Sequence, residues 1–331
     1  MLNKIKKKSA SFTISGEPYG YGHLKRMIVL NSKLKKNKIH NHIIDISKLT
    51  INKIKKIDLE IYNLLFIDFS NNFFFKTKKF NFFLKYLSNY REKIFIFDSV
   101  EKDIIQILAK NKKNRFLICP YFLPKSKKLK TKKFNCFYGP NYFLFDKIYL
   151  NKRKSHKLKK IFLSCGGLDE YNYTYKIAKI IFSINTQVEI HATIGPMFKQ
   201  ININLIKLLK KNNRFYLYNS VKNPSKISQK CDLAIVSSGL TKYEMAASKV
   251  NLAVFSENSI HAKYNSSFAK SKLAYNLSNF DNNSFMKYKL DHLVNNYYDI
   301  FYKNYKFKKN LLKNNKFNVI LNNAKSNNHP K

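Results

Sequence analysis

The sequence predicts an α/β protein of two domains, each built on a parallel β-sheet. Short apolar strand signals alternate with helical signals along the chain, which is typical of parallel sheets covered by helices. The length of 331 residues is enough for two such domains. The alternation stops once, at residues 147–160 (KIYLNKRKSHKLKK), where the chain is polar and rich in charge. We therefore expect a first domain over residues 1–150 and a second over 151–331, and leave open whether the terminal helix packs back onto the first.

The first domain is expected to contain strands that end in acidic residues. Residues 63–69 (NLLFIDF) and 93–98 (KIFIFD) are continuous apolar runs, as expected for strands buried on both faces. Asp68 and Asp98 would then lie at the sheet edge where open α/β sheets bind ligands. An acid in that place can equally cap the next helix, and for each one alone capping is the better interpretation. Further strands are expected at 9–14, 38–46 and 115–119, and a helix at 80–90.

The second domain repeats the alternation. A strand at 160–164 runs into a Gly-Gly pair, and a later strand at 232–236 runs into Ser-Ser-Gly. Both turns join a strand to a helix, and they should lie on the same edge of one sheet. Further strands are expected at 188–194, 215–218 and 251–255, and helices at 173–183, 201–211, 223–230, 240–248, 268–273 and 290–305.

Charge and composition narrow the class of protein. The chain has 63 Lys and Arg residues against 19 Asp and Glu, which gives a formal net charge of +44. The basic residues are spread along the whole chain rather than gathered in one tail, so we expect no nucleic-acid partner. Such a charge still favours anionic ligands, and it is compatible with weak contact with an anionic membrane surface.

Other global features set the expected environment. The hydrophobic content of 44% indicates a globular chain, and no apolar run is long enough to form a transmembrane segment. No signal peptide is recognised, so the cytoplasm is the expected location. The cysteines are scattered without zinc spacing, so we expect no metal site. No cofactor is expected either. They are Cys119, Cys136, Cys165 and Cys231.

The first motif is the stretch 15–27, SGEPYGYGHLKRM, between the first strand and a helix. Gly20 and Gly22 can adopt positive φ and let the backbone approach a ligand closely. His23 lies on the first helical turn, where free backbone N–H groups favour an anion, and Arg26 lies on the same helical face. A histidine in that place is suited to act as a general base or acid. An ordinary tight connection with a helix-start histidine explains this motif alone equally well.

The second domain carries two candidate phosphate-binding turns. Small residues at a strand-to-helix turn can wrap a diphosphate, and an acid one helical turn later can bind both ribose hydroxyls. The alternative is a capped helix with an exposed glutamate, Glu244, at its start. The candidate residues are Gly166, Gly167 and Asp169 at the first turn, Ser238, Gly239, Thr241 and Glu244 at the second, and Asn258 after the next strand.

In their order and spacing, these motifs resemble the PseG/SpsG-type nucleotide-sugar hydrolases over roughly residues 11–274. The resemblance implies the GT-B-like fold of the MurG-like superfamily, in which two Rossmann-like parallel-sheet domains face each other across a cleft. The matching residues are Gly20, Gly22, His23 and Arg26, then Asp68, then Gly139, Pro140 and Tyr142, then Gly166, Gly167 and Asp169, and finally Ser238, Gly239, Thr241, Glu244, Glu257 and Asn258.

The resemblance also implies an activity and a role for each residue. Family members hydrolyse UDP-2,4-diacetamido-2,4,6-trideoxy-β-L-altropyranose to UDP and the free sugar in pseudaminic-type (nonulosonic) acid biosynthesis. His23 would activate the water as the catalytic base. The first domain would bind the sugar, through Gly20, Gly22, Arg26, Asp68 and Tyr142. The second would bind UDP, through Gly166, Gly167, Asp169, Ser238, Gly239, Thr241, Glu244 and Asn258.

The chain departs from the family pattern mainly on the sugar side. Phe69 and Ser70 stand where the family has histidine and tyrosine, Ser99 stands where it has an acid, and Ser259 stands where it has glutamine. Two alternatives therefore remain. One is a GT-B glycosyltransferase that uses a UDP-sugar donor, with His23 deprotonating an acceptor hydroxyl. The other is a catalytically silent nucleotide-sugar-binding protein.

Overall fold

The structure is a computed structural model. It describes residues 8–98, 105, 109, 112–123, 135–146, 155–167, 169–195, 198, 203–280, 283–304 and 315–325. By its internal contacts the chain divides into two compact units, Met1–Asp146 with Asn315–Lys331, and Lys147–Asn314. Most of the predicted linker, residues 147–154, lies outside the described residues.

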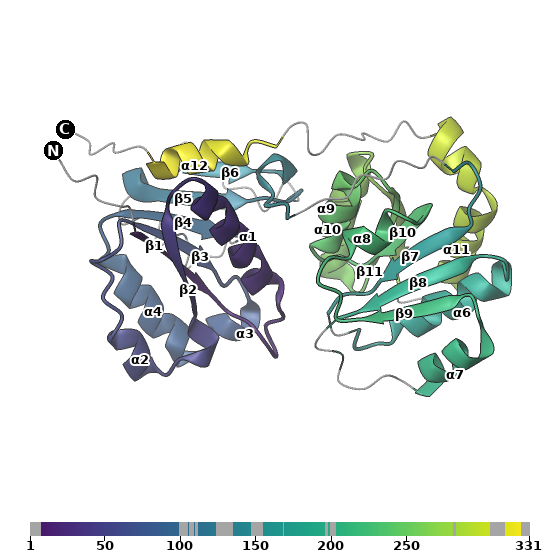
Figure 1. The fold of residues 1–331 in the computed structure, drawn as a ribbon, viewed down its shortest axis with the longest axis horizontal. Helices are drawn as coiled ribbons and strands as arrows, with labels where there is room; N and C mark the ends of the chain where they lie inside the picture. The colour runs from purple at the N-terminus through teal and green to yellow at the C-terminus, as the bar shows by residue number, and fades with distance from the viewer. Residues whose placement is uncertain are drawn as a thin grey trace. The chain divides into compact units, whose positions relative to one another are not determined.

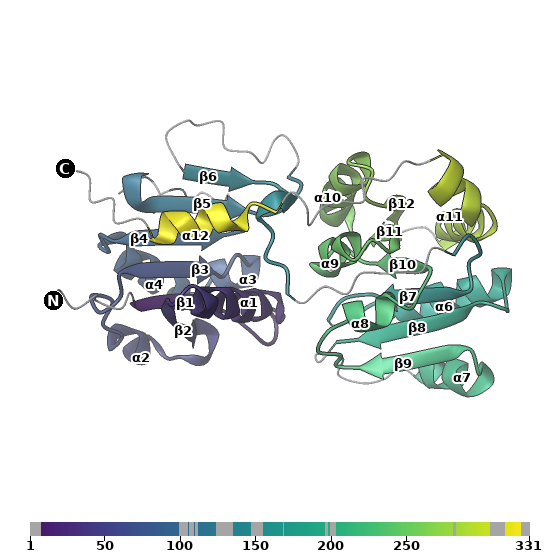
Figure 2. The same cartoon turned by 45° about the horizontal axis from the view of Figure 1, so that its top comes forward.

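The described part of the first unit is built on a six-stranded parallel sheet (Figures 1 and 2). The central strand β3 is buried along its whole length, so its sequence LLFID is continuously apolar up to the final Asp68. The register pairs Thr13 with Asp68, so β1 and β3 end side by side. The strand order is β2 (His40–Asp45), β1 (Lys8–Thr13), β3 (Leu64–Asp68), β4 (Lys93–Phe97), β5 (Arg115–Cys119) and β6 (Asn135–Tyr138).

Helices cover both faces of this sheet. One face packs against α1 (Gly22–Lys36) and the C-terminal helix α12 (Phe317–Lys325), through a row of stacked rings that includes Phe95 and Phe116, whose centroids are 4.5 Å apart. The other face packs against the helices that follow β2 and β3. They are α2 (Ile51–Lys55), α3 (Asn72–Phe75) and α4 (Lys78–Ser88).

The second unit is built on another six-stranded parallel sheet among the described residues. Its order is β12 (Tyr275–Asn279), β11 (Asn251–Ser256), β10 (Leu233–Val236), β7 (Lys160–Ser164), β8 (Glu189–Ile194) and β9 (Phe215–Asn219). The helices are α6 (Tyr173–Ile184), α7 (Ile203–Lys211), α8 (Ser225–Ser228), α9 (Thr241–Ala247), α10 (Ser259–Lys270) and α11 (Asn283–Asn295), with a π-helical turn at Asp299–Asn304. A buried core on one face joins the sheet to α6, α7 and α11.

Each sheet has a point where the strand order reverses. In the first unit the chain goes from β1 outward to β2 and then returns to β3 on the other side of β1. In the second unit it goes from β7 outward to β8 and β9 and then returns to β10 on the other side of β7. In open α/β sheets, ligands bind beyond the carboxyl ends of the two strands that flank such a reversal. The topology therefore indicates candidate ligand sites at the turns after β1 and β3, and at those after β7 and β10.

The predicted α/β class with two parallel sheets is confirmed, and so is each predicted strand. Two strands went unpredicted, β6 (NCFY) and β12 (YNLSN), because they lie at sheet edges and carry polar residues that weaken the apolar signal. The helix predicted at 268–273 is wrong, since α10 ends at Lys270 and strand β12 follows. The long helix predicted at 290–305 is instead α11 followed by the separate π-helical turn.

None of the helices in the described ranges combines the length and the apolar character needed to cross a lipid bilayer.

We predict that the packing of α12 on the first unit contributes strongly to its stability. Ile320 is fully buried, whereas its neighbour Val319 is 41% exposed. Ile320→Ala should lower the free energy of unfolding by about 2–4 kcal/mol, because it leaves a cavity between the helix and the sheet. The matched control Val319→Ala should change it by less than about 0.5 kcal/mol. Equal effects of the two variants in urea unfolding would contradict this packing.

Candidate functional site

The turn after β1 is a tight loop closed by its own backbone. The amide of Gly20 donates to the carbonyl of Gly16 at 2.7 Å, and both glycines have left-handed φ, +84° for Gly16 and +80° for Gly20. Other residues rarely adopt this conformation, which explains the glycine at each position. The sequence analysis assigned the second left-handed position to Gly22, and that assignment is wrong. Gly22 is the first residue of α1, and Gly16 has the left-handed conformation.

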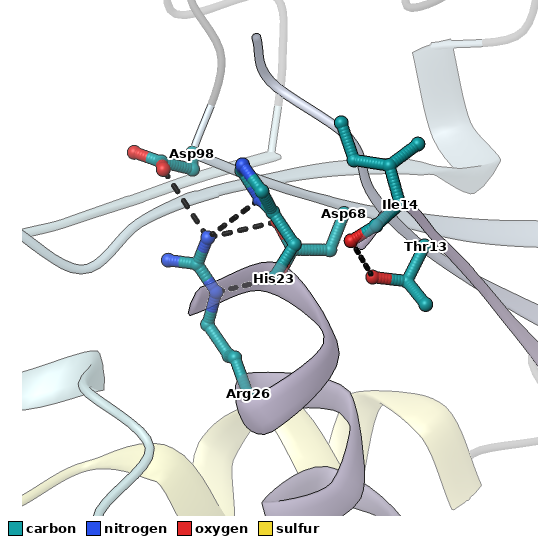
Figure 3. A network of polar contacts seen from close by, with 6 residues as sticks. All are labelled: Thr13, Ile14, His23, Arg26, Asp68 and Asp98. Atoms are coloured by element: carbon teal, nitrogen blue, oxygen red, sulfur yellow. Dashed lines mark hydrogen bonds and ion pairs between the residues drawn. The ribbon is translucent and has the colours of Figure 1, made fainter. Parts of the chain in front are cut away.

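The turn places His23 and Arg26 beside the end of β3 (Figure 3). The carboxylate of Asp68 accepts hydrogen bonds from both side chains. Its Oδ1 accepts from His23 Nδ1 at 2.7 Å and from Arg26 Nη2 at 2.8 Å, while its Oδ2 accepts from Arg26 Nε. Asp68 is fully buried and Arg26 is only 4% exposed. The structure thus brings three of the predicted residues into one cluster at the reversal point of the first sheet.

A second carboxylate extends the cluster. Asp98, which follows β4, accepts from Arg26 Nη2 at 3.2 Å (Figure 3). The Arg26 guanidinium also lies over the rings of Phe97 and Tyr121, 5.9 and 5.6 Å from their centroids. From the sequence, a helix cap was the favoured role for Asp98. The ion pair with Arg26 is a different role, and sequence could not reveal it because the two residues are 72 positions apart.

The charges in this cluster set the protonation states of its acids. Burial alone would raise the pKa of Asp68, but the charges and hydrogen bonds of Arg26 and His23 outweigh it and hold that pKa below its usual range. Burial and the nearby Asp68 raise the pKa of Asp98, against the opposing effect of Arg26. Burial alone would lower the pKa of Arg26, but the carboxylates of Asp68 and Asp98 outweigh it and raise that pKa. Two acids with opposite shifts are typical of sites that move protons.

The ionised carboxylate of Asp68 fixes the tautomer of His23. A carboxylate accepts hydrogen bonds, so His23 Nδ1 must carry the proton that points at Asp68 Oδ1. The lone pair is then on Nε2, for which the described residues offer no hydrogen-bond partner. The His23 side chain is 11% exposed, so a small part of it reaches solvent. An imidazole held in this way can accept a proton at Nε2.

Tyr142 does not join this cluster. It ends a short 3-10 turn, Pro140–Tyr142, that follows β6, and its ring packs 5.2 Å from that of Phe137. Two strands, β4 and β5, separate β6 from β3 in the sheet. The predicted sugar-binding role of Tyr142 therefore gains no support from a contact with His23 or Asp68.

In the second unit, the turns after β7 and β10 lie against each other. Gly166 has a φ of +90°, and a Cβ built on it would lie 3.5 Å from Ser237 Oγ. The amide of Ser237 donates to the carbonyl of Ser164 at 3.1 Å. The predicted residue Gly166 thus meets Ser237 at the reversal point of the second sheet, and Gly167 follows it in the same turn.

A third turn supports this arrangement. A Cβ on Gly195, which follows β8, would lie 2.5 Å from the Cα of Gly167. Glycine at position 195 lets the two turns touch through their backbones. The sequence alone does not reveal this contact, because Gly167 and Gly195 are distant along the chain.

Two of the predicted nucleotide-binding residues cap helices. The carboxylate oxygens of Asp169 accept from the amides of Tyr173 and Thr174, at 2.7 and 3.0 Å, at the start of α6. Burial raises the pKa of Asp169, although these hydrogen bonds oppose the shift. The side chain of Asn258 accepts from the amide of His261 at 2.9 Å and caps α10. These contacts are structural, and they leave Asp169 with both oxygens already engaged.

Glu244 was expected on the exposed start of its helix, and that expectation is wrong. Its side chain is only 6% exposed, because α9 is a short helix whose residues 242–247 are all buried. Thr241, the first residue of α9, is partly buried, and Ser238 and Gly239 precede it at the surface of the turn. Ser238 and Gly239 thus stay at the surface of the turn, whereas Glu244 is buried.

Known proteins show the class of fold. No model of a protein family matches the chain. An uncharacterized protein of Methanocaldococcus jannaschii is 25% identical over 284 residues, which cover 76% of this chain and 56% of that protein. The chain therefore spans about half the length of the curated relative it matches.

Solved structures are similar over most of the chain. MurG from Acinetobacter baumannii has a TM-score of 0.54 at 13% identity, covering 94% of each chain. HepE from Anabaena, solved with UDP and glucose, has a TM-score of 0.54 at 9% identity, covering 96% of this chain and 95% of that one. The glycosyltransferase SnogD from Streptomyces nogalater has a TM-score of 0.52 at 10% identity, covering 88% and 94%. The GT-B fold predicted from the sequence is confirmed by this likeness.

We predict that Asp68 stabilises the first unit in a pH-dependent way. Asp68→Asn removes the charge that pairs with buried Arg26, so the free energy of unfolding at pH 7 should fall by about 3 kcal/mol. Because the pKa of Asp68 is lowered by folding, this contribution is fully present above its unfolded value of about 4 and is lost as the pH falls further.

The measurement is the difference in free energy of unfolding between wild type and Asp68→Asn from pH 7 down to pH 3. The exposed Asp58 provides the control, and Asp58→Asn should have little effect at any of these pH values. A difference that stays constant below pH 4 would contradict the ion pair.

Proposed function

We propose that this chain catalyses glycosyl transfer from a UDP-sugar to a hydroxyl group of an acceptor, with His23 as the general base. The observation that carries the proposal is the hydrogen bond of 2.7 Å between His23 Nδ1 and Asp68, which leaves the Nε2 lone pair for a substrate proton. The GT-B fold supports it, since the structurally similar proteins include glycosyltransferases and a protein bound to UDP and glucose.

The proposed reaction is a single displacement at the anomeric carbon. Nε2 of His23 takes the proton of the acceptor hydroxyl, and the oxygen attacks the anomeric carbon of the sugar. The bond between that carbon and the β-phosphate oxygen breaks, and UDP leaves with the electron pair. Attack opposite the leaving group inverts the anomeric centre. Asp68 stays ionised and stabilises the imidazolium that forms, while Arg26 holds the Asp68 carboxylate in place.

We assign nucleotide binding to the second unit. The turns at Gly166–Gly167 and Ser237–Gly239 flank the strand-order reversal, where backbone amides and small side chains can receive a diphosphate. The net charge of +44 would attract such an anion over long range. Glu244 stays the candidate for the ribose hydroxyls, although its side chain is only 6% exposed.

Hydrolysis is the second candidate, with water in place of the acceptor hydroxyl. The resemblance to the PseG/SpsG-type hydrolases favours it, through the spacing of Gly20, Gly22, His23 and Arg26. A second observation weakens it. Phe69, which replaces the family's histidine, is 1% exposed and packs against Phe74 and Phe80 in the aromatic core. Its side chain is therefore unable to bind the sugar that such hydrolases use.

The test is to incubate the pure protein with UDP-sugars in ¹⁸O-labelled water and to follow UDP release with and without candidate acceptors. Transfer predicts UDP release that depends on an acceptor and gives an unlabelled glycoside. Hydrolysis predicts release without an acceptor and a free sugar carrying ¹⁸O. If the protein binds UDP but turns over no UDP-sugar under any of these conditions, it is a nucleotide-sugar-binding protein. That result would contradict both enzymatic proposals.

We predict that His23→Ala lowers turnover by ~10²–10⁴-fold, the usual contribution of a positioned general base. Binding of UDP should stay within about two-fold of wild type, since the nucleotide is assigned to the other unit. The exposed histidine His40 on β2 gives the control, and His40→Ala should leave turnover unchanged. Unchanged turnover in His23→Ala would remove His23 from the mechanism.

A further inference from the structure

A lysine is buried beside the candidate nucleotide turn, and the proposed function leaves it unused. Lys242 is the second residue of α9 and its side chain is only 2% exposed. Its ammonium lies 5.4 Å from the ring centroid of Tyr243 and 5.3 Å from that of Phe268. Lysine is almost never fully buried without a partner, because removing the charge from water is costly. Its position therefore calls for an explanation.

Lys242 has one hydrogen-bond partner among the described residues. Its Nζ donates to Oδ1 of Asn265, on α10, at 2.8 Å. Asn265 is itself fully buried. A lysine can offer only hydrogens here, so the contact fixes the orientation of the Asn265 amide, with its oxygen toward Lys242 and its nitrogen on the opposite side.

The nitrogen of Asn265 then faces the nucleotide turn. The two hydrogens of Nδ2 are shared among three acceptors, Ser238 Oγ at 3.0 Å, Ser256 Oγ at 3.1 Å and the carbonyl of Phe255 at 2.8 Å. Because Ser238 Oγ accepts from Asn265, its own hydrogen is left to donate elsewhere. Ser238 is partly exposed and Gly239 beside it is exposed, so this hydrogen can reach a bound anion.

We propose that Lys242 is a positioning residue for the nucleotide diphosphate, acting through Asn265 to orient the hydroxyl of Ser238 as a donor to a phosphate oxygen. This inference rests on the proposed nucleotide site of the second unit. The chain of contacts runs from a buried cation through a fully buried amide to a hydroxyl at the surface of the turn. Each link is directional, and the carbonyl of Phe255 also holds Nδ2 of Asn265. Loss of the lysine leaves the buried Oδ1 of Asn265 without its donor, which loosens the amide that orients the serine hydroxyl.

The same position couples nucleotide binding to protons. Burial lowers the pKa of Lys242 to about 7, so the group is partly neutral at physiological pH. A diphosphate nearby favours the charged form, so binding takes up a proton and weakens as the pH rises above 7. Charged or titratable groups on the surrounding elements do not enter this shift. They are Lys226 on α8, Asp232 before β10, Tyr243 and Glu244 on α9, Glu257 after β11, and His261, Lys263, Tyr264 and Lys270 on α10.

The experiment measures UDP binding by titration calorimetry in Lys242→Met, Ser238→Ala and the double variant. Lys242→Met should weaken binding about ten-fold, the effect expected for one hydrogen bond that depends on a charged group. In the Ser238→Ala background the same change should weaken it by less than about two-fold, because the two residues act in series. The exposed Lys249, at the end of α9, gives the control Lys249→Met, which should bind like wild type. Independent, additive effects of the two variants would overturn the proposal.

A second measurement uses the unaltered chain and so does not depend on how the variants fold. Binding enthalpies at pH 7 in two buffers of different ionisation enthalpy give the number of protons taken up with UDP. Wild type should take up protons as UDP binds, up to about half a proton at pH 7, and no uptake would overturn the coupling. Lys242→Met serves as the control, and it should lack this uptake. If wild type binds neither UDP nor thymidine diphosphate, the proposed function itself fails. If wild type binds UDP and Lys242→Met binds it equally well at every pH, only the role of Lys242 fails.

Discussion

The candidate site depends on one buried carboxylate. Asp68 is fully buried at the end of a central strand, and it is held there as an anion by the guanidinium of Arg26 and the imidazole of His23. An unpaired charge in that place would be too costly to keep, so the three residues are mutually dependent. Arg26 keeps the carboxylate ionised, and the ionised carboxylate decides which nitrogen of His23 can accept a proton. The proposed chemistry follows from this electrostatic arrangement.

The sheet topology explains why such groups meet. Asp68 ends β3 and His23 follows β1, and these strands are neighbours because the strand order reverses between them. The second unit repeats this logic at β7 and β10, where Gly166 and Ser237 come into contact. Both candidate sites thus lie at the position where parallel sheets leave a crevice between diverging connections. The likeness to GT-B glycosyltransferases extends over both units, which agrees with this double arrangement.

Much of the fold and part of the candidate site could be predicted from the sequence, because these features depend on local patterns. The apolar run NLLFID predicted both β3 and the acid at its end, and the Gly-x-Gly-His stretch predicted the turn into α1. What sequence could not supply is the pairing of residues distant along the chain. The ion pair of Arg26 with Asp98, the contact of Gly195 with Gly167 and the burial of Lys242 beside Asn265 all depend on strand order and helix packing. Glu244 was placed on the surface for the same reason, since a helix of seven residues shows too few turns to reveal which faces are covered.

The proposed chemistry depends on Asp68 holding His23 with its proton on Nδ1 and its lone pair on Nε2. The most direct test is ¹⁵N NMR of the histidine side chains near pH 8, with the His23 signals assigned by their absence in His23→Gln. We expect a protonated Nδ1 and an unprotonated Nε2 for His23, and a shift of that balance in Asp68→Asn. A proton on Nε2 in the wild-type protein would contradict it, because the nitrogen that must accept the substrate proton would already be occupied.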